Sequence, residues 1–240
     1  MVMLFAGANM SRHMGNSMNY KMVVFDMAGT TVRDPGLVAR ALVGALADDG
    51  CAVDEAAAQP LMGYKKPEAI RRLLLAQEQR ADADRVERIH GDFVTRMLRC
   101  YQESDEVAPM ADAQAVFAEL RRSGMRVALN TAFSRSIADA IVERFGWLRA
   151  GVIDDLIATD EVPAGRPEPH MIRTLMARQG LTDARSVVKV GDTEVDIREG
   201  RNAGAGLVVA VTTGAFTRQA LLPFEPDHII DRLQDLPGLL

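Results

Sequence analysis

The sequence predicts an α/β fold with a doubly wound parallel sheet and an inserted all-helical cap domain. From Pro109 onward, short apolar runs alternate with amphipathic helical patterns through short connections, as in sheets whose parallel strands are joined by helices. Between about Gly36 and Asp105 helical spacing recurs without a convincing strand. We therefore expect a core formed by residues 20–35 and 106–240 and a helical cap over 36–105. We expect a flexible tail over 1–19.

The individual elements follow from apolar spacing and from turn residues. The first strand is the apolar run Met22–Phe25, which ends at Asp26 and a Gly-Thr-Thr turn. The other strands are expected at 126–130, 152–159, 186–190, 207–211 and 227–230. Helices are expected at 37–47, 54–62, 67–79 and 82–101 in the cap, and at 111–123, 131–145, 170–179 and 194–203 in the core.

Composition excludes several classes of protein. The chain has 240 residues and a net charge of −5, which argues against a nucleic-acid-binding surface. It has no apolar run of membrane-spanning length, and the run Met1–Ala6 is too short for a signal peptide. Cys51 and Cys100 lie far apart in probable helices, so we expect no disulfide framework and a cytoplasmic protein. The four histidines lack metal-ligand spacing, so a zinc site is not expected.

Polar residues stand at or beside the ends of four predicted strands. Asp26 follows the first strand, Thr131 follows 126–130, and Arg166 lies in the loop after 152–159. Asp192 follows 186–190, with Asp196 one helical turn later. Because the carboxyl ends of parallel strands share one edge of a sheet, these side chains are expected to converge.

These residue types are together suited to phosphoryl transfer. Asp26 and Asp192 are hard oxygen ligands suited to Mg²⁺, and Asp26 also has an oxygen free to attack phosphorus. Thr131 offers a hydroxyl, and Arg166 a fork that matches a phosphoryl group. Asp196 would support the magnesium site or orient Arg166. Each residue also has an ordinary structural explanation, such as a helix cap for Thr131 or an exposed loop position for Arg166, but their coincidence in order is improbable.

With these motifs the chain from Lys21 onward resembles the haloacid dehalogenase (HAD) superfamily of phosphohydrolases. The resemblance implies that Asp26 becomes an aspartyl phosphate and that Thr131 and Arg166 bind phosphate. It also implies that Asp192, with Asp196, binds Mg²⁺, and that the carbonyl of Ala28 is a further magnesium ligand. From the turn itself we expect backbone N–H groups, at Gly29 and Thr30, to face the phosphate.

Ala28 is a departure that narrows the assignment. Most phosphatases of the superfamily have an aspartate there, which protonates the leaving group, and alanine cannot donate a proton. The protein could be inactive, could expel a leaving group that needs no acid, or could supply the acid elsewhere. Ala28 together with Arg166 resembles the phosphonatase (phosphonoacetaldehyde hydrolase) branch, which cleaves a carbon–phosphorus bond after an aldehyde condenses with a cap lysine.

The cap carries a match to that lysine motif. Met62-Gly63-Tyr64-Lys65-Lys66 places Lys66 at the lysine position, with Met62 and Gly63 expected in the substrate pocket. Like-charge repulsion from Lys65 is expected to lower the pKa of Lys66 and favour the neutral amine. The alternative is that both lysines form an exposed helix start.

Three other positions depart from the phosphonatase itself. Ala69 stands where it has a histidine, Phe133 where it has a tyrosine, and Gly36 where it has a cysteine. The resemblance is therefore to phosphonatase-like hydrolases, and these residues leave the substrate open among phosphonoacetaldehyde, another phosphonate and a phosphate ester.

The leading hypothesis is a Mg²⁺-dependent hydrolase of a carbonyl-bearing phosphonate, with Asp26 as nucleophile and Lys66 as the imine-forming amine. The alternative is a phosphatase for small phosphate esters, followed by a non-catalytic binding protein and then by a haloalkanoate dehalogenase, which would not need Asp192 and Asp196. The expected partner is a small phosphonate or phosphate, with no nucleic acid and no membrane. We expect the apolar helix Leu37–Leu46 to be partly exposed, and the resemblance implies a possible homodimer through the cap.

Overall fold

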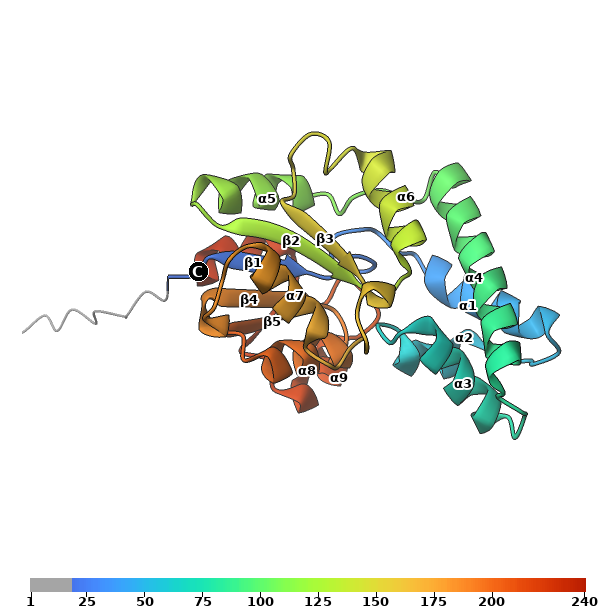
Figure 1. The fold of residues 1–240 in the computed structure, drawn as a ribbon. Coiled ribbons are helices and arrows are strands. Elements are labelled where there is room, and N and C mark those ends of the chain that lie inside the picture. Colours follow the sequence, from blue (N-terminus) through green and yellow to red (C-terminus); the bar gives the residue numbers. More distant parts are fainter. Residues whose placement is uncertain (1–18) are drawn as a thin grey trace, which may run out of the picture.

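A computed structural model of the protein describes residues 19–240 and shows one six-stranded sheet of order β3-β2-β1-β4-β5-β6 (Figure 1). All five strand pairings are parallel, which confirms the predicted fold class. The predicted tail lies almost wholly outside the described residues. The strands are β1 (Met22–Phe25), β2 (Arg126–Thr131), β3 (Asp155–Ala158), β4 (Val187–Gly191), β5 (Leu207–Val211) and β6 (His228–Ile230).

Helices flank the sheet and form the cap. The cap helices are α1 (Leu37–Asp48), α2 (Glu55–Ala58), α3 (Lys66–Ala76) and α4 (Ala83–Glu103). The others are α5 (Ala113–Arg122), α6 (Arg135–Phe145), α7 (His170–Arg178), α8 (Glu194–Ala203) and the short α9 (Arg218–Leu221), which the sequence analysis did not predict. Every helix in residues 19–240 is too short or too polar to span a bilayer.

The apolar composition of β1 follows from its central place in the sheet. β1 pairs with β2 on one side and β4 on the other, and all four of its residues are fully buried. Phe25 packs on Phe117 of α5, with ring centroids 5.1 Å apart, whereas Val24 belongs to the apolar cluster on the opposite face. A strand covered on both faces reads as a continuous apolar run, so the first polar residue after it, Asp26, stands in the middle of the carboxyl edge.

Two linker segments that lie side by side connect the cap to the core. Val32 forms an antiparallel bridge with Pro109, and the N–H of Met110 donates to the carbonyl of Thr31 at 2.9 Å. The cap helices lie beyond the carboxyl edge of the sheet, to the right in Figure 1. Residues 36–105, all of them described, contain no strand.

Several predicted elements are shorter than expected, and two of them have half their expected length or less. The helix predicted over 54–62 is α2 followed by a 3₁₀ turn, Gln59–Leu61, with Pro60 in its first positions. The strand predicted over 152–159 is only β3, because the N–H groups of Val152 and Ile153 bond back to the carbonyl of Trp147.

The apolar helix Leu37–Leu46 is mostly buried, and only part of it is exposed: Arg40 is exposed and Val43 is half-buried. Leu42 and Leu46 are fully buried, and Leu37 is the most exposed of the buried side chains of α1, at 7%. The helix uses its apolar face inside the cap because α4, a long amphipathic helix, covers it.

Candidate active site

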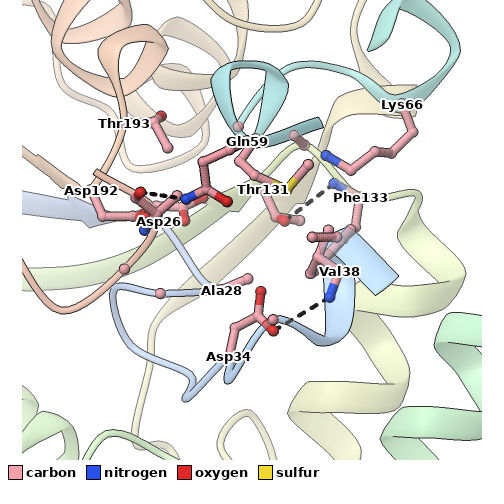
Figure 2. A pocket seen from close by; sticks show the side chains of 18 residues that line it. Asp26, Ala28, Asp34, Val38, Gln59, Lys66, Thr131, Phe133, Asp192 and Thr193 are labelled. Carbon is pink, nitrogen blue, oxygen red and sulfur yellow. Dashed lines mark hydrogen bonds between the residues drawn. The ribbon is translucent and has the colours of Figure 1, made fainter. Parts of the chain in front are cut away.

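A cavity of about 210 Å³ lies between the carboxyl edge of the sheet and the cap (Figure 2). This size suits a small ligand rather than a drug-sized one. Core and cap both contribute to its lining, which comprises Asp26, Ala28, Gly29, Asp34, Gly36, Val38, Ala39, Gln59, Met62, Gly63, Lys66, Thr131, Ala132, Phe133, Asp192, Thr193, Gly214 and Ala215. The structure therefore brings most of the predicted site residues together.

The turn after β1 holds Asp26 at the floor of this cavity. The N–H of Asp26 still belongs to the sheet, donating to the carbonyl of Val190 at 2.9 Å. Gly29 has φ = 84°, and a Cβ there would come within 2.7 Å of Oδ2 of Asp192. Glycine is therefore required both by the backbone conformation and by the close approach of the second acid.

Phosphate binding through the N–H groups of Gly29 and Thr30 is not supported. The N–H of Gly29 donates to Val32 at 2.8 Å and that of Thr30 to Met27 at 3.2 Å, because the turn closes on itself. The hydroxyl of Thr30 donates to Oδ1 of Asp192 at 2.9 Å. Thr30 thus holds the Asp192 carboxylate in place and does not line the cavity.

Other donors face the cavity. Ala28 and Ala132 both line it, and within residues 19–240 their N–H groups have no hydrogen-bond acceptor. Thr131 is the last residue of β2, and its Oγ1 accepts the N–H of Phe133 at 3.2 Å. Its hydroxyl proton remains available to a phosphoryl oxygen. The two N–H groups and the Thr131 hydroxyl together offer hydrogen-bond donors to an anion bound near Asp26.

Arg166 occupies a different place from the one expected. Its side chain is fully buried and does not line the cavity. Nη1 contacts Asp26 at 2.6 Å and Asp196 at 3.0 Å, Nε contacts Glu199 at 3.1 Å, and Nη2 contacts the backbone and side-chain oxygens of Asn130 at 2.8 and 2.6 Å. The guanidinium thus makes four hydrogen bonds to the protein and an additional ion pair with Asp196. In this arrangement Arg166 orients the Asp26 carboxylate from outside the cavity.

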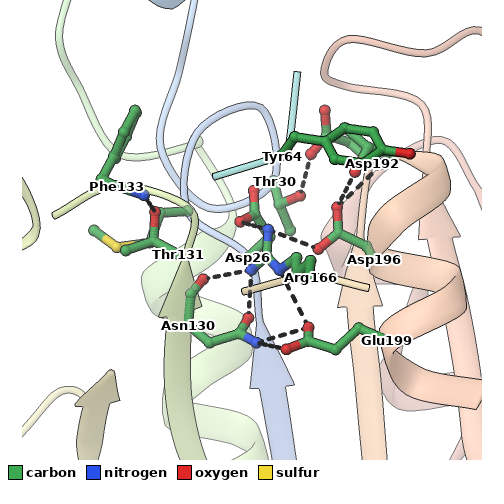
Figure 3. A network of polar contacts seen from close by, with 12 residues as sticks. Asp26, Thr30, Tyr64, Asn130, Thr131, Phe133, Arg166, Asp192, Asp196 and Glu199 are labelled. Atoms are coloured by element: carbon green, nitrogen blue, oxygen red, sulfur yellow. Dashed lines mark hydrogen bonds and ion pairs between the residues drawn. The ribbon is translucent and has the colours of Figure 1, made fainter. Parts of the chain in front are cut away.

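Sequence analysis missed the rest of this network (Figure 3). Lys189, fully buried in β4, contacts Asn130 at 2.8 Å, Asp196 at 2.9 Å and Glu199 at 3.4 Å. Asn130 also donates to both carboxylate oxygens of Glu199, at 3.0 and 2.8 Å. A signal existed, because a lysine inside the run Val187–Val190 must be paired if that strand is buried.

Three acids could hold a metal ion. Asp26, Asp192 and Asp196 each have an oxygen within 4.8 Å of the others, and all are buried. Burial raises the pKa of the Asp192 carboxyl well above its usual range, and the negative charges of Asp26 and Asp196 raise it further. A divalent cation would relieve this repulsion, and oxygen donors suit a hard ion such as Mg²⁺. The donor set therefore fits the expected metal.

Lys66 is the cap residue that reaches the cavity. It is 2% exposed at the start of α3, so it is not part of an exposed helix start. Nζ donates to the carbonyl of Tyr64 at 3.1 Å and lies 5.9 Å from the ring centroid of Phe133. Burial lowers its pKa to about 8, with Arg166 adding to the shift and Asp26 opposing it. The expected direction is confirmed, but Lys65 is not its cause.

The remaining cap residues shape the cavity wall. Gly63 has φ = 84°, and a Cβ there would come within 2.4 Å of Oγ1 of Thr193, so the cap contacts the core closely at this point. Met62 and Gly36 also line the cavity, whereas Ala69 is fully buried in α3. The wall near Lys66 is therefore largely apolar, which explains the low pKa of its amine.

A family model described as haloacid dehalogenase-like hydrolase matches residues 20–204. The phosphonoacetaldehyde hydrolase of Bordetella avium is 32% identical, over 91% of this chain and 89% of that protein. The phosphonoacetaldehyde hydrolase of Bacillus thuringiensis subsp. konkukian is 28% identical, over 90% and 86%.

Two solved structures share the fold. A phosphonoacetaldehyde hydrolase-like protein from Oleispira antarctica superimposes with a TM-score of 0.81 at 22% identity, covering 99% of this chain and 95% of that one. A putative phosphoglycolate phosphatase from Lactobacillus delbrueckii subsp. bulgaricus gives 0.76 at 20% identity, covering 92% and 98%.

Proposed function

The chain belongs to the haloacid dehalogenase-like hydrolases and is similar to phosphonoacetaldehyde hydrolases, and on this basis we propose that it cleaves the carbon–phosphorus bond of phosphonoacetaldehyde or a related phosphonate. One observation carries the proposal. A buried lysine with a pKa of about 8 shares a small cavity with the buried Asp26. At pH 7 about one amine of that pKa in ten is neutral, far more than for an ordinary lysine, and the neutral amine can attack an aldehyde.

The steps follow from the residues present. Lys66 condenses with the aldehyde and water leaves, so that the substrate carries an iminium next to the carbon bound to phosphorus. Asp26 attacks phosphorus, the carbon–phosphorus bond breaks, and its electron pair moves into the iminium to give an enamine. The N–H groups of Ala28 and Ala132 and the hydroxyl of Thr131 hold the phosphoryl oxygens. Water then hydrolyses the aspartyl phosphate, while protonation of the enamine and hydrolysis of the resulting iminium release the dephosphorylated aldehyde and restore the Lys66 amine.

This chemistry accounts for Ala28. An alkoxide leaving group would need a proton from that position, whereas an enamine needs none as the carbon–phosphorus bond breaks. Burial raises the pKa of the Asp26 carboxyl, and Arg166, in contact with Oδ1 at 2.6 Å, opposes that shift and orients the carboxylate.

The proposed cofactor is Mg²⁺, held by carboxylates of Asp26 and Asp192 and by the carbonyl of Ala28. When bound, it would neutralise charge on the phosphoryl group and on the acids. Asp196, paired with Arg166 at 3.0 Å and Lys189 at 2.9 Å, would support this site from behind rather than bind the ion.

A substrate panel tests the proposal directly. We expect phosphate release from phosphonoacetaldehyde in the presence of Mg²⁺, loss of that release with a chelator, and a covalent adduct at Lys66 after borohydride reduction. Absence of an adduct, with phosphate esters turned over at full rate by Lys66→Ala, would instead establish the alternative, a small-molecule phosphatase.

Two further expectations from the sequence stay predictions. One is a homodimer through the cap, for which the molar mass in solution is the test. The other is a cytoplasmic location. The burial of the apolar face of α1 means that a cap interface would have to use other side chains.

A further inference from the structure

One acid in the cavity has no assigned role. Among the described residues that line the cavity, the groups that exchange protons in the ordinary pH range are Asp26, Asp34, Lys66 and Asp192. Asp26 is held by Arg166, and Asp192 is held by Thr30 and by the N–H of Ala215 at 2.7 Å. Asp34 lies in the linker between core and cap, eight residues after the nucleophile.

The two oxygens of Asp34 have different surroundings. Oδ1 accepts the N–H groups of Leu37 at 2.6 Å and Val38 at 3.3 Å, which fixes the carboxyl at the first turn of α1. Oδ2 has no hydrogen-bond partner within residues 19–240, and Figure 2 shows the second oxygen directed away from the helix. A side chain anchored through one oxygen and free at the other is positioned to exchange a proton with a ligand.

Asp34 and Lys66 influence each other across the cavity. The positive charge of Lys66 favours the ionised form of Asp34, and the carboxylate favours the ammonium form of Lys66. They form no ion pair within 4.0 Å, and both line the cavity, so one small ligand could contact both. Burial raises the pKa of the Asp34 carboxyl, and the other charged or titratable groups near it are Arg40 on α1 and Tyr101 on α4.

Imine formation creates a need for such a group. Two protons must reach the carbonyl oxygen before it can leave as water, and the nitrogen must lose one after it attacks. At the position where the phosphonatase has a histidine this chain has Ala69, which cannot exchange protons.

We propose that Asp34 is the general acid and base for imine formation at Lys66, an inference that rests on the proposed function. Asp34, as the carboxylic acid, protonates the aldehyde oxygen while neutral Nζ forms the carbon–nitrogen bond. The resulting carboxylate takes a proton from the nitrogen and then gives it to the hydroxyl. That oxygen departs as water while the nitrogen lone pair closes the carbon–nitrogen double bond. The products are the iminium, one water and the Asp34 carboxylate.

Asp34→Asn tests the role while preserving the anchor. Asparagine can accept the N–H groups of Leu37 and Val38 but cannot transfer a proton. The rate of borohydride trapping at Lys66 with phosphonoacetaldehyde is measured together with the melting temperature. We expect an unchanged melting temperature and trapping slower by about 100-fold or more, the usual share of acid–base catalysis.

A second variant covers the case in which the first fails to fold. Asp34→Ser keeps a capping oxygen and leaves space for a small acid, so added formate is expected to accelerate trapping. Trapping of Asp34→Asn at the wild-type rate, or a slow Asp34→Ser that does not respond to formate, would overturn the inference. Wild-type protein that consumes no phosphonoacetaldehyde and is never trapped would overturn the proposed function and this inference with it.

Discussion

Two buried cations, one in the core behind Asp26 and one in the cap beside the cavity, differ in their surroundings. Arg166, in the core, contacts five protein oxygens, three of them carboxylate oxygens. Burial works against its charge, but these carboxylates outweigh it and raise the pKa of Arg166. Lys66, in the cap, has one backbone acceptor and an apolar wall, and burial lowers its pKa to about 8.

The difference separates a structural charge from a reactive one. A buried cation with a complete set of partners stays charged and orients its neighbours. A buried cation with too few partners gives up its proton, which is what an amine nucleophile needs. In the proposed reaction, the core thus holds Asp26 in one geometry while the cap supplies the amine. Substitutions can alter the core cation, Arg166, or the cap cation, Lys66, one at a time.

The largest expected effect is on catalysis, from Lys66→Arg. Arginine keeps a positive charge in the cap but stays protonated, so it cannot form the imine. We expect phosphate release from phosphonoacetaldehyde to fall by about 10⁴-fold or more, as for removal of other covalent catalytic groups. Lys65→Arg is the matched control and should keep its activity. A Lys66→Arg enzyme within tenfold of wild type would exclude an essential imine.

The next effect is on stability, from Arg166→Met. Removing this guanidinium leaves Asp26, Asp196 and Glu199 buried with one cation, Lys189, among them. We expect the free energy of unfolding to fall by about 3–5 kcal/mol, measured by urea denaturation. Arg99→Met, which breaks an exposed pair with Glu103 at 3.6 Å, is the control and should cost less than about 1 kcal/mol. Equal effects of the two variants would contradict the assignment of Arg166 as a structural charge.

Lys66→Met is expected to change the free energy of unfolding in the opposite direction from Arg166→Met. Burial of the ammonium costs stability at pH 7, so its removal should raise the free energy of unfolding by up to about 3 kcal/mol. Between about pH 8 and 10.5 the folded chain has lost this proton and the unfolded chain has not, so wild-type stability rises with pH. The advantage of Lys66→Met should therefore shrink across that interval. Lys65→Met, at the half-buried neighbouring position, should change stability by no more than about 0.5 kcal/mol.

The smallest expected effect is the shifted titration midpoint of the Lys66 amine, which can be measured directly. Competitive acetylation of Lys66 should show a midpoint near pH 8 in the folded protein and near pH 10.5 in the denatured chain. At pH 7 this makes about one amine in ten neutral, so reactivity should rise about tenfold up to the plateau. A midpoint near 10.5 in the folded protein would remove the distinction between Lys66 and an ordinary lysine.

The sequence alone predicted the features that depend on the order of residues along the chain. Apolar runs that end in Asp26, Thr131 and Asp192 predicted parallel strands, and parallel strands bring their carboxyl ends to one edge. Ala28 is informative for the same reason, because its lack of a proton is a property of the residue itself. The resemblance that rests on these motifs predicted the family correctly.

Only the tertiary structure decided what each side chain contacts. It placed Arg166 behind Asp26, closed the N–H groups of Gly29 and Thr30 within their own turn, and paired Lys189 with acids from another element. It also showed that burial, and not the adjacent Lys65, lowers the pKa of Lys66. Burial and ion pairing arise from residues far apart in the chain, so residue order predicts which groups meet at the edge of the sheet but not which of them remain charged.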